Sequence, residues 1–263
     1  MKPIFPYFEQ PVIEVAGLQI HGFALFGALG CALGSWYAIR RARRSGLDAD
    51  LISLLLAWLI VGGIAGAHVF YGLFYAPDEF FAHPIRFLEF WNGLSSFGGI
   101  FVGLLGVIFL IWWHGYPILR YLDGLLFAVL IFFAFARFGC FLAHDHPGTV
   151  SNFWFAVPGI CPGARGDVSL ACHDLALYEV FFAAAAFLVV WLLARRHRPP
   201  GLLVLVVAPA YAALRFFLDG LRPEVTDRHY LGYAPGQYAA LVLGVLCIVL
   251  LLALARGASK SKE

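Results

Sequence analysis

The sequence predicts an all-α, polytopic integral membrane protein, a bundle of about seven transmembrane helices. Of its 263 residues, 62% are hydrophobic and 13% are charged, whereas soluble domains carry roughly 25% charged residues. The mean hydropathy is +0.83. Seven apolar runs reach, within a residue or two, the length of about 20 residues that a spanning helix needs. Apolar and polar residues do not alternate along these runs, which disfavours a membrane β-barrel.

These seven runs are the expected helices. In chain order they lie near residues 17–39, 51–76, 93–113, 121–143, 175–194, 200–218 and 236–255. Residues 1–263 are therefore expected to form a single transmembrane domain, with an outer loop region at about 144–174. A Pro-rich and acidic stretch precedes the first run instead of a short basic one, so no removable signal peptide is expected.

The basic residues predict the orientation of the bundle. If the odd-numbered helices end in the cytoplasm, eleven Lys and Arg residues lie inside and five outside, which places the N-terminus outside and the C-terminus in the cytoplasm. The net charge of +2 then reflects topology, and no nucleic-acid partner is expected. The outer connections are long and rich in Trp, Tyr, Pro and Gly. Because long ordered loops tend to carry function, chemistry is expected on the outer side.

The long outer loop contains cysteine residues that could form a disulfide and histidine residues that could bind a metal. An oxidising outer compartment permits a disulfide between Cys161 and Cys172, and the sequence leaves this pairing open. The cluster His144, Asp145 and His146 contains metal-ligand types, but this spacing alone is weak evidence. Neither a CxxC nor an HExxH pattern occurs, so no metal site and no cofactor are expected.

Arg137 lies inside the apolar run at residues 121–143. Its guanidinium keeps its proton, and at membrane depth it costs at least about 2.5 kcal/mol on the mildest insertion scale. We therefore expect the site to need a fixed positive charge. Asp123 is fourteen residues away, or roughly 21 Å of helix rise, which is too far for a direct pair. Asp145 or a lipid phosphate is the expected anion.

Other buried charges have plausible packing roles. Arg215 and Asp219 are four residues apart in the sixth run, the spacing of an internal ion pair. Glu179 lies near the start of the fifth run. His21 and His68 are expected inside the first and second helices, where a lone histidine is commonly a hydrogen-bonded packing residue. For His68 a functional role is an equal alternative.

Gly98 and Gly99 follow Ser95 and Ser96 at the expected start of the third helix. Free backbone N–H groups at such a start can face an anion. Close packing against another helix is the alternative, and we favour it for Gly99.

The order of motifs resembles the prolipoprotein diacylglyceryl transferases, seven-helix bacterial membrane enzymes, across nearly the whole chain. The first- and second-helix motifs of that family are similar to GlyLeuGlnIleHisGlyPhe at 17–23 and GlyAlaHisValPheTyr at 66–71. The family signature is matched in register by AlaArgPheGlyCysPheLeuAlaHisAspHisProGly at 136–148. Two further motifs resemble HisAspLeuAlaLeuTyrGlu at 173–179 and TyrAlaAlaLeuArgPhePheLeuAspGlyLeuArg at 211–222, the latter followed by Gly236 and Gln237.

The resemblance implies a reaction at the outer side of the bacterial inner membrane. The diacylglyceryl group of phosphatidylglycerol passes to the lipobox cysteine thiol of a prolipoprotein signal peptide, forming a thioether and releasing glycerol 1-phosphate. Arg137 and Arg215 match the family's two important arginines, which bind the phosphate and stabilise the leaving anion. The expected lipid-binding residues, with these two arginines, are Asp145, Gly148, Gly98, Gly99, His21 and His68.

The chain departs from the family pattern around the proton acceptor. The family's candidate base histidine is replaced by Phe97 or Gly98, depending on a one-residue register choice. His144 and His146 are the expected replacement bases, because they follow Arg137 closely and a proline-ended turn can fold them back. A helix C-terminal turn is an equal explanation of these histidines. The alternative function is that of a catalytically impaired paralogue that binds phospholipid in the membrane.

Overall fold

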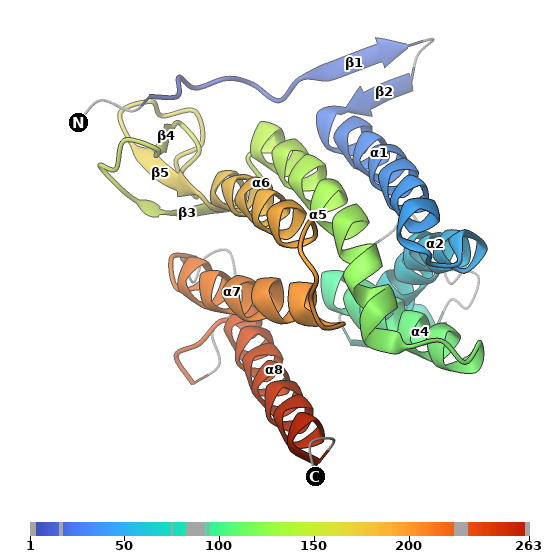
Figure 1. Cartoon of the computed structure of the whole chain (residues 1–263). Coiled ribbons are helices and arrows are strands. Elements are labelled where there is room, and N and C mark those ends of the chain that lie inside the picture. Colours follow the sequence, from blue (N-terminus) through green and yellow to red (C-terminus); the bar gives the residue numbers. More distant parts are fainter. Residues whose placement is uncertain are drawn as a thin grey trace. The chain divides into compact units, whose positions relative to one another are not determined.

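The computed structural model describes residues 4–15, 18–74, 76–82, 93, 95–223 and 231–260. These residues are mostly helical, which confirms the all-α prediction (Figure 1). Each apolar run contains one long helix. These helices are α1 (Gly22–Ser45), α2 (Ala49–Phe74), α4 (Ser96–Trp113), α5 (Ile118–Ala143), α6 (Leu175–Leu193), α7 (Leu202–Asp219) and α8 (Pro235–Lys260), and the short α3 (Pro77–Ala82) follows α2.

Five of the described helices are long and apolar enough to cross a membrane, namely α1, α2, α5, α6 and α7. In α4 and α8 the apolar stretches found are shorter, Gly98–Trp113 and Gly236–Leu252. The chain is therefore a multi-pass membrane protein. The count of about seven spans and the orientation stay predictions.

Polar side chains and glycines set several helix ends. The Oδ1 atom of Asp48 accepts the N–H groups of Asp50 and Leu51 at 2.9 and 3.1 Å, which caps the start of α2. Asp174 caps α6 in the same way, because its Oδ1 accepts the Leu177 N–H at 3.2 Å. Before α7, Gly201 has a φ of +89°, a conformation that glycine adopts without strain.

The prediction that His21 lies inside the first helix is wrong. His21 ends the strand β2 (Leu18–His21), which pairs antiparallel with β1 (Val12–Val15), and its register partner is Val12. The backbone of β2 is thus paired with β1 before α1 begins at Gly22, whose N–H donates to Pro11. The predicted helical run at 17–39 included β2, because apolar composition alone does not separate a strand from a helix.

The described chain forms two compact units. The first contains Met1–Gly34 and Leu126–Glu263, and the second contains Ser35–Leu125. The expected single transmembrane domain stays a prediction. In the second unit α2 packs against α4 through small residues. A Cβ on Gly98 would collide with the Gly66 carbonyl, and one on Gly99 would lie 3.1 Å from the Gly63 carbonyl. The packing role expected for Gly99 is confirmed.

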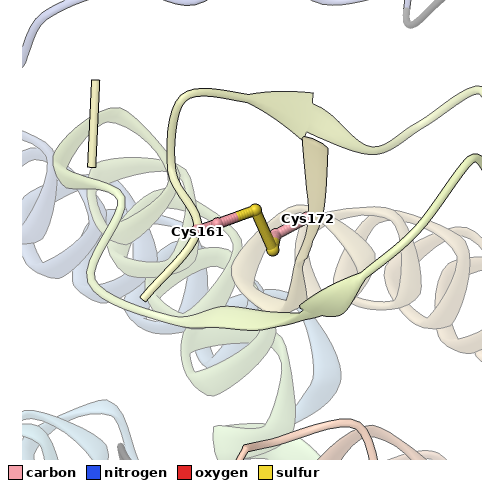
Figure 2. The surroundings of a disulfide bond; sticks show 2 residues. All are labelled: Cys161 and Cys172. Carbon is pink, nitrogen blue, oxygen red and sulfur yellow. A yellow bond between two sulfur atoms is a disulfide. The ribbon is translucent and has the colours of Figure 1, made fainter. Parts of the chain in front are cut away.

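The loop between α5 and α6, predicted to lie on the outer side, is folded around a small sheet and a disulfide. The strands β3 (Pro147–Val150), β4 (Val157–Pro158) and β5 (Ala171–Asp174) pair antiparallel in the order β3-β5-β4. Cys161 and Cys172 are disulfide-bonded, which settles the pairing that the sequence left open (Figure 2). The bond lies in a buried cluster with Cys140, Phe141 and Val157. Because β5 continues directly into α6, the cluster fixes the start of that helix.

Removing the disulfide should destabilise the protein. Replacing both Cys161 and Cys172 by serine frees a short loop in the unfolded chain, a change worth about 2–3 kcal/mol for loops of this size. We expect the melting temperature in detergent to fall by several degrees, and a reductant to lower it in the wild type but not in the double variant. Cys31→Ala is the control, since Cys31 is a free cysteine. An unchanged melting temperature in both tests would contradict this role.

Candidate functional site

A buried carboxylate, Glu179 on α6, joins two arginines from different helices. Its Oε2 atom lies 2.8 Å from Nε of Arg137 on α5, and its Oε1 atom lies 3.1 Å from Nη1 of Arg215 on α7. The Tyr211 hydroxyl also donates to Oε1, at 3.2 Å. The Glu179 side chain is fully buried, whereas the two arginine side chains keep 18% and 19% of their surface exposed. The carboxylate is thus enclosed while each guanidinium retains an accessible portion.

Of the two anions expected beside Arg137, Asp145 was wrong, and the lipid phosphate stays a prediction. The anion is Glu179 and not Asp145, whose residue is exposed. Glu179 lies four residues after the start of α6, and this position gives no sign of its partner. Glu179 becomes the counter-ion only because α6 packs beside Arg137. One face of the Arg137 guanidinium lies over the Phe133 ring, 5.2 Å from its centroid, a further stabilising contact for a desolvated cation.

The ion pairs continue beyond Arg215 through Asp219. Nε of Arg215 lies 3.0 Å from Asp219 Oδ2, so the predicted pair four residues apart is confirmed. Nε of Arg222, just past the end of α7, lies 2.9 Å from Asp219 Oδ1. We call these five side chains, Arg137, Glu179, Arg215, Asp219 and Arg222, the arginine cluster. The arginine cluster links α5, α6 and the end of α7 around two buried carboxylates, those of Glu179 and Asp219.

The start of α8 completes the surroundings of Asp219. A Cβ on Gly236 would collide with the Asp219 carboxylate, so only glycine allows this approach. The positive end of the α8 dipole thus faces an anion, a stabilising arrangement. Gln237 braces the same turn: its Nε2 donates to the Phe216 carbonyl at 3.1 Å, and its Oε1 accepts the Ala234 N–H at 3.0 Å.

His146 lies beside the arginine cluster and is held neutral. Its Nδ1 atom is 3.5 Å from Nη2 of Arg222. Because a guanidinium only donates hydrogen bonds, Nδ1 accepts and the ring hydrogen lies on Nε2. Burial, followed by the charges of Arg137, Arg222 and Arg215, lowers the pKa of His146 from 6.5 to about 3. The charges of both arginines of the predicted site, Arg137 and Arg215, thus act on His146.

His144 has different surroundings. It is buried, with Nδ1 3.4 Å from Asp174 Oδ2 and Nε2 3.1 Å from the Phe8 carbonyl. Its backbone has a φ of +52° just past the end of α5, the left-handed conformation of a helix C-terminal turn. Both ring nitrogens thus have partners in the fold, which favours a structural role for His144 and leaves His146 as the better placed candidate base.

The other predicted lipid-binding residues are divided between the two compact units, with Gly148 and His21 in the first. Gly148 is buried near the cluster, where a Cβ would lie 3.1 Å from His173, Leu175 and the Leu221 carbonyl, so close packing explains the glycine. His21 is exposed at the end of β2. His68, Gly98 and Gly99 belong to the second unit. There His68 is buried, with Nδ1 3.3 Å from the Gly93 carbonyl. Lipid binding by all of these residues stays a prediction.

The sequence indicated two members of the arginine cluster, and the glycine beside it, only indirectly. Glu179 and Arg222 lie in the motifs at 173–179 and 211–222, and Gly236 follows them, but none was assigned to the site. The available signal was a titratable residue inside or beside an apolar run, since such residues are rare and mark functional or paired positions. The helix that each one faces could not be obtained from that signal.

Comparison with known proteins gives one consistent result. A family model described as prolipoprotein diacylglyceryl transferase matches residues 10–253. Relatives named phosphatidylglycerol–prolipoprotein diacylglyceryl transferase include one from Pseudomonas paraeruginosa, 30% identical over 258 residues that cover 95% of this chain and 92% of the relative. Others come from Pseudoalteromonas atlantica (29% identity, 93% and 89% coverage) and Neisseria meningitidis serogroup C (28% identity, 94% and 95% coverage).

Removing the Glu179 charge should destabilise the fold. Glu179→Gln keeps the shape but leaves Arg137 and Arg215 without their shared counter-ion, and breaking a buried pair in this way costs about 3–5 kcal/mol. We expect a clear fall in melting temperature in detergent. The control is Glu14→Gln, because Glu14 is exposed on β1. Equal melting temperatures for the two variants would refute a stabilising role for Glu179.

The pKa of His146 predicts a pH dependence of stability. Its folded-state pKa, about 3, lies below the unfolded value of 6.5, so the unfolded state binds the proton first and stability falls as the pH drops below 6.5. One such group contributes at most about 1.4 kcal/mol per pH unit. His146→Gln should therefore lose less stability than the wild type between pH 7 and pH 5. Exposed His197, changed to Gln, is the control; identical pH dependence in all three proteins would contradict the assignment.

Proposed function

The chain belongs to the prolipoprotein diacylglyceryl transferase family, matched over residues 10–253, and from this premise we propose how its own residues perform the transfer. The enzyme moves the diacylglyceryl group of phosphatidylglycerol to a prolipoprotein, a step of lipoprotein biosynthesis at a membrane. In the proposed reaction the lipobox cysteine sulfur attacks the glyceryl carbon. The carbon–oxygen bond to phosphate breaks, glycerol 1-phosphate leaves, and a thioether remains.

The arginine cluster is the proposed phosphate site. Among the residues that the structure describes, its three arginines and two carboxylates sum to a charge of +1, while His146 is neutral. A phosphodiester carries one negative charge and so neutralises the cluster. The partly exposed guanidinium groups of Arg137 and Arg215 supply the donors, and guanidinium geometry suits phosphate oxygens. This charge balance, held by the buried Glu179, is the single observation that carries the proposal.

The same arginines stabilise the leaving group. As the carbon–oxygen bond breaks, charge develops on the phosphate oxygen, and fixed donors in a water-poor site favour that charge more than the starting ester. Glu179 and Asp219 hold the guanidinium groups in place before the lipid arrives, so little reorganisation accompanies the reaction. Arg137 and Arg215 are thus proposed as catalytic residues and Glu179 as a positioning residue.

We propose His146 as the base that takes the thiol proton. In the lipid-free site its Nδ1 is occupied by Arg222, and a pKa of about 3 makes it a weak base. A phosphodiester bound at the cluster would add a negative charge beside the ring and engage Arg222, which raises the pKa of His146 and releases Nδ1. Thiolate formation then depends on the lipid being bound.

The proposed setting is the outer face of the bacterial inner membrane, where phosphatidylglycerol and the lipobox of an exported prolipoprotein meet. The His146 turn and the sheet of the outer loop adjoin the cluster, in keeping with a site at the outer end of α5. In the first unit, Asp145, Gly148 and His21 remain proposed contacts of the lipid. For His68, Gly98 and Gly99, which belong to the second unit, lipid binding remains a separate proposal.

A second candidate function rests on the departure from the family pattern. Phe97 or Gly98 replaces the family's candidate base histidine, so the chain would bind phosphatidylglycerol without transferring its diacylglyceryl group. Incubating the purified protein with phosphatidylglycerol and a lipobox peptide separates the two. A mass increase on the peptide cysteine supports the transferase, and bound lipid without any modified peptide supports the binding protein.

Loss of either arginine charge should abolish most of the transfer. Arg137→Gln and Arg215→Gln each remove a phosphate donor, and the loss of one such donor lowers kcat by about 10²–10³-fold. The peptide mass assay measures this. Arg43→Gln, at an exposed position near the end of α1, should keep the wild-type rate. A transfer rate within two-fold of the wild type in both site variants would contradict phosphate binding by Arg137 and Arg215.

Replacing the histidines tests the base directly. Positioned general bases contribute about 10²–10⁴-fold, so His146→Ala should lower kcat by at least 10²-fold with lipid binding retained. His144→Ala should act mainly on stability, because its ring bonds two parts of the fold. A full transfer rate in His146→Ala would exclude His146 as the base.

A further inference from the structure

Aromatic side chains gather on the outer loop between β3 and β4. Phe153 and Trp154 keep 43% and 40% of their surface exposed. Phe155 packs against the cluster around the disulfide. We call Phe153, Trp154, Phe155 and Phe181 the aromatic patch. Exposed apolar groups of this kind on a loop indicate an interaction surface.

The aromatic patch continues a surface that faces lipid. The Trp154 and Phe155 rings are 3.9 Å apart between centroids, and Phe155 lies 5.3 Å from Phe181. Phe181 is on α6, one of the helices able to cross a membrane, and is 48% exposed. The side chains thus form an unbroken aromatic path from the spanning helix to the loop.

This part of the loop carries no charge. Residues 149–163 contain no Asp, Glu, Lys or Arg. Two titratable groups, His173 and Tyr178, are in ring contact with Phe153, and Nδ1 of His173 lies 2.7 Å from the Tyr178 hydroxyl. Burial lowers the pKa of His173, which keeps the ring neutral at physiological pH. An uncharged surface avoids the cost of carrying ions into a membrane interface.

The backbone holds these rings in place. The Phe153 N–H donates to the Ser151 hydroxyl at 3.1 Å, and the Phe153 carbonyl accepts the Ala156 N–H at 2.9 Å. The Trp154 carbonyl accepts the Ile4 N–H at 2.9 Å, so the N-terminal segment braces the turn. A fixed turn presents Phe153 and Trp154 at little cost in conformational entropy on binding.

We propose that residues 151–155 insert into the interfacial layer of the outer leaflet, with Phe153 and Trp154 among the lipid headgroups. Tryptophan and other aromatic residues are enriched at this depth because one part of the ring is apolar and another is polar. The loop begins at β3, immediately after His146, so the inserted turn anchors that side of the site at headgroup level. The anchor needs only a spanning α6 and does not depend on the transfer reaction.

Quenching by brominated lipid tests this insertion. The wild type and Trp154→Phe are placed in nanodiscs containing phospholipids dibrominated near the headgroup end of the chain, and the difference of the two emission spectra reports Trp154. We expect the brominated lipid to remove at least half of the difference emission, while aqueous acrylamide has little effect. Trp191→Phe, near the other end of α6, validates the subtraction. The conservative change to Phe preserves the fold, which an unchanged melting temperature verifies.

Two results would overturn the proposal. In the first, brominated lipid leaves the difference emission intact and acrylamide quenches it, so Trp154 lies in water. In the second, acrylamide quenching disappears only when a lipobox peptide is added, which would assign the aromatic patch to the peptide. Neither result would bear on the transfer assignment, because the peptide mass assay measures that separately.

Discussion

The organisation of the site depends on one buried carboxylate. Glu179 holds Arg137 from α5 and Arg215 from α7 at 2.8 and 3.1 Å, and without it two guanidinium groups in apolar helices would lack a shared counter-ion. Glu179 fills only part of each guanidinium's hydrogen-bonding capacity, because Arg carries five N–H donors in a fixed fork. The ion pair therefore fixes the arginines and still leaves donors for a phosphate. In the proposed function, stability and substrate binding therefore rest on the same contact.

Burial and the positive charge of the arginine cluster explain why His146 is neutral beside it. Burial of His146, followed by the charges of three arginines, disfavours the imidazolium. An anionic substrate reverses the field of these charges. The sequence predicts Phe97 or Gly98 in place of the family's candidate base histidine. In the proposed mechanism the turn after α5 supplies a histidine in a place where the substrate's own charge would activate it. Lipid binding and thiol activation are thereby coupled in the proposed mechanism.

Much of the fold could be predicted because apolar length and local spacing are properties of the sequence. The seven long helices and the pair of Arg215 with Asp219 follow from them. The partner of Arg137 could not be predicted, because Glu179 meets it only through packing between helices. His21 was misplaced, because composition does not distinguish a short strand from the start of a helix. The neutral state of His146 depends on its burial and on the charges of Arg137, Arg222 and Arg215. Arg137 is close in sequence, but the burial and the other two charges come from the packing of the chain, which no local pattern encodes.

The lipid selectivity of the protein shows whether the arginine pair held by Glu179 binds the phosphatidylglycerol phosphate. Native mass spectrometry of the purified protein would measure the retention of phosphatidylglycerol relative to zwitterionic phosphatidylcholine. The charge balance predicts a strong preference for phosphatidylglycerol in the wild type, and its loss when both Arg137 and Arg215 are changed to Gln in a protein that stays folded. An equal preference in the wild type and the double variant would contradict the account.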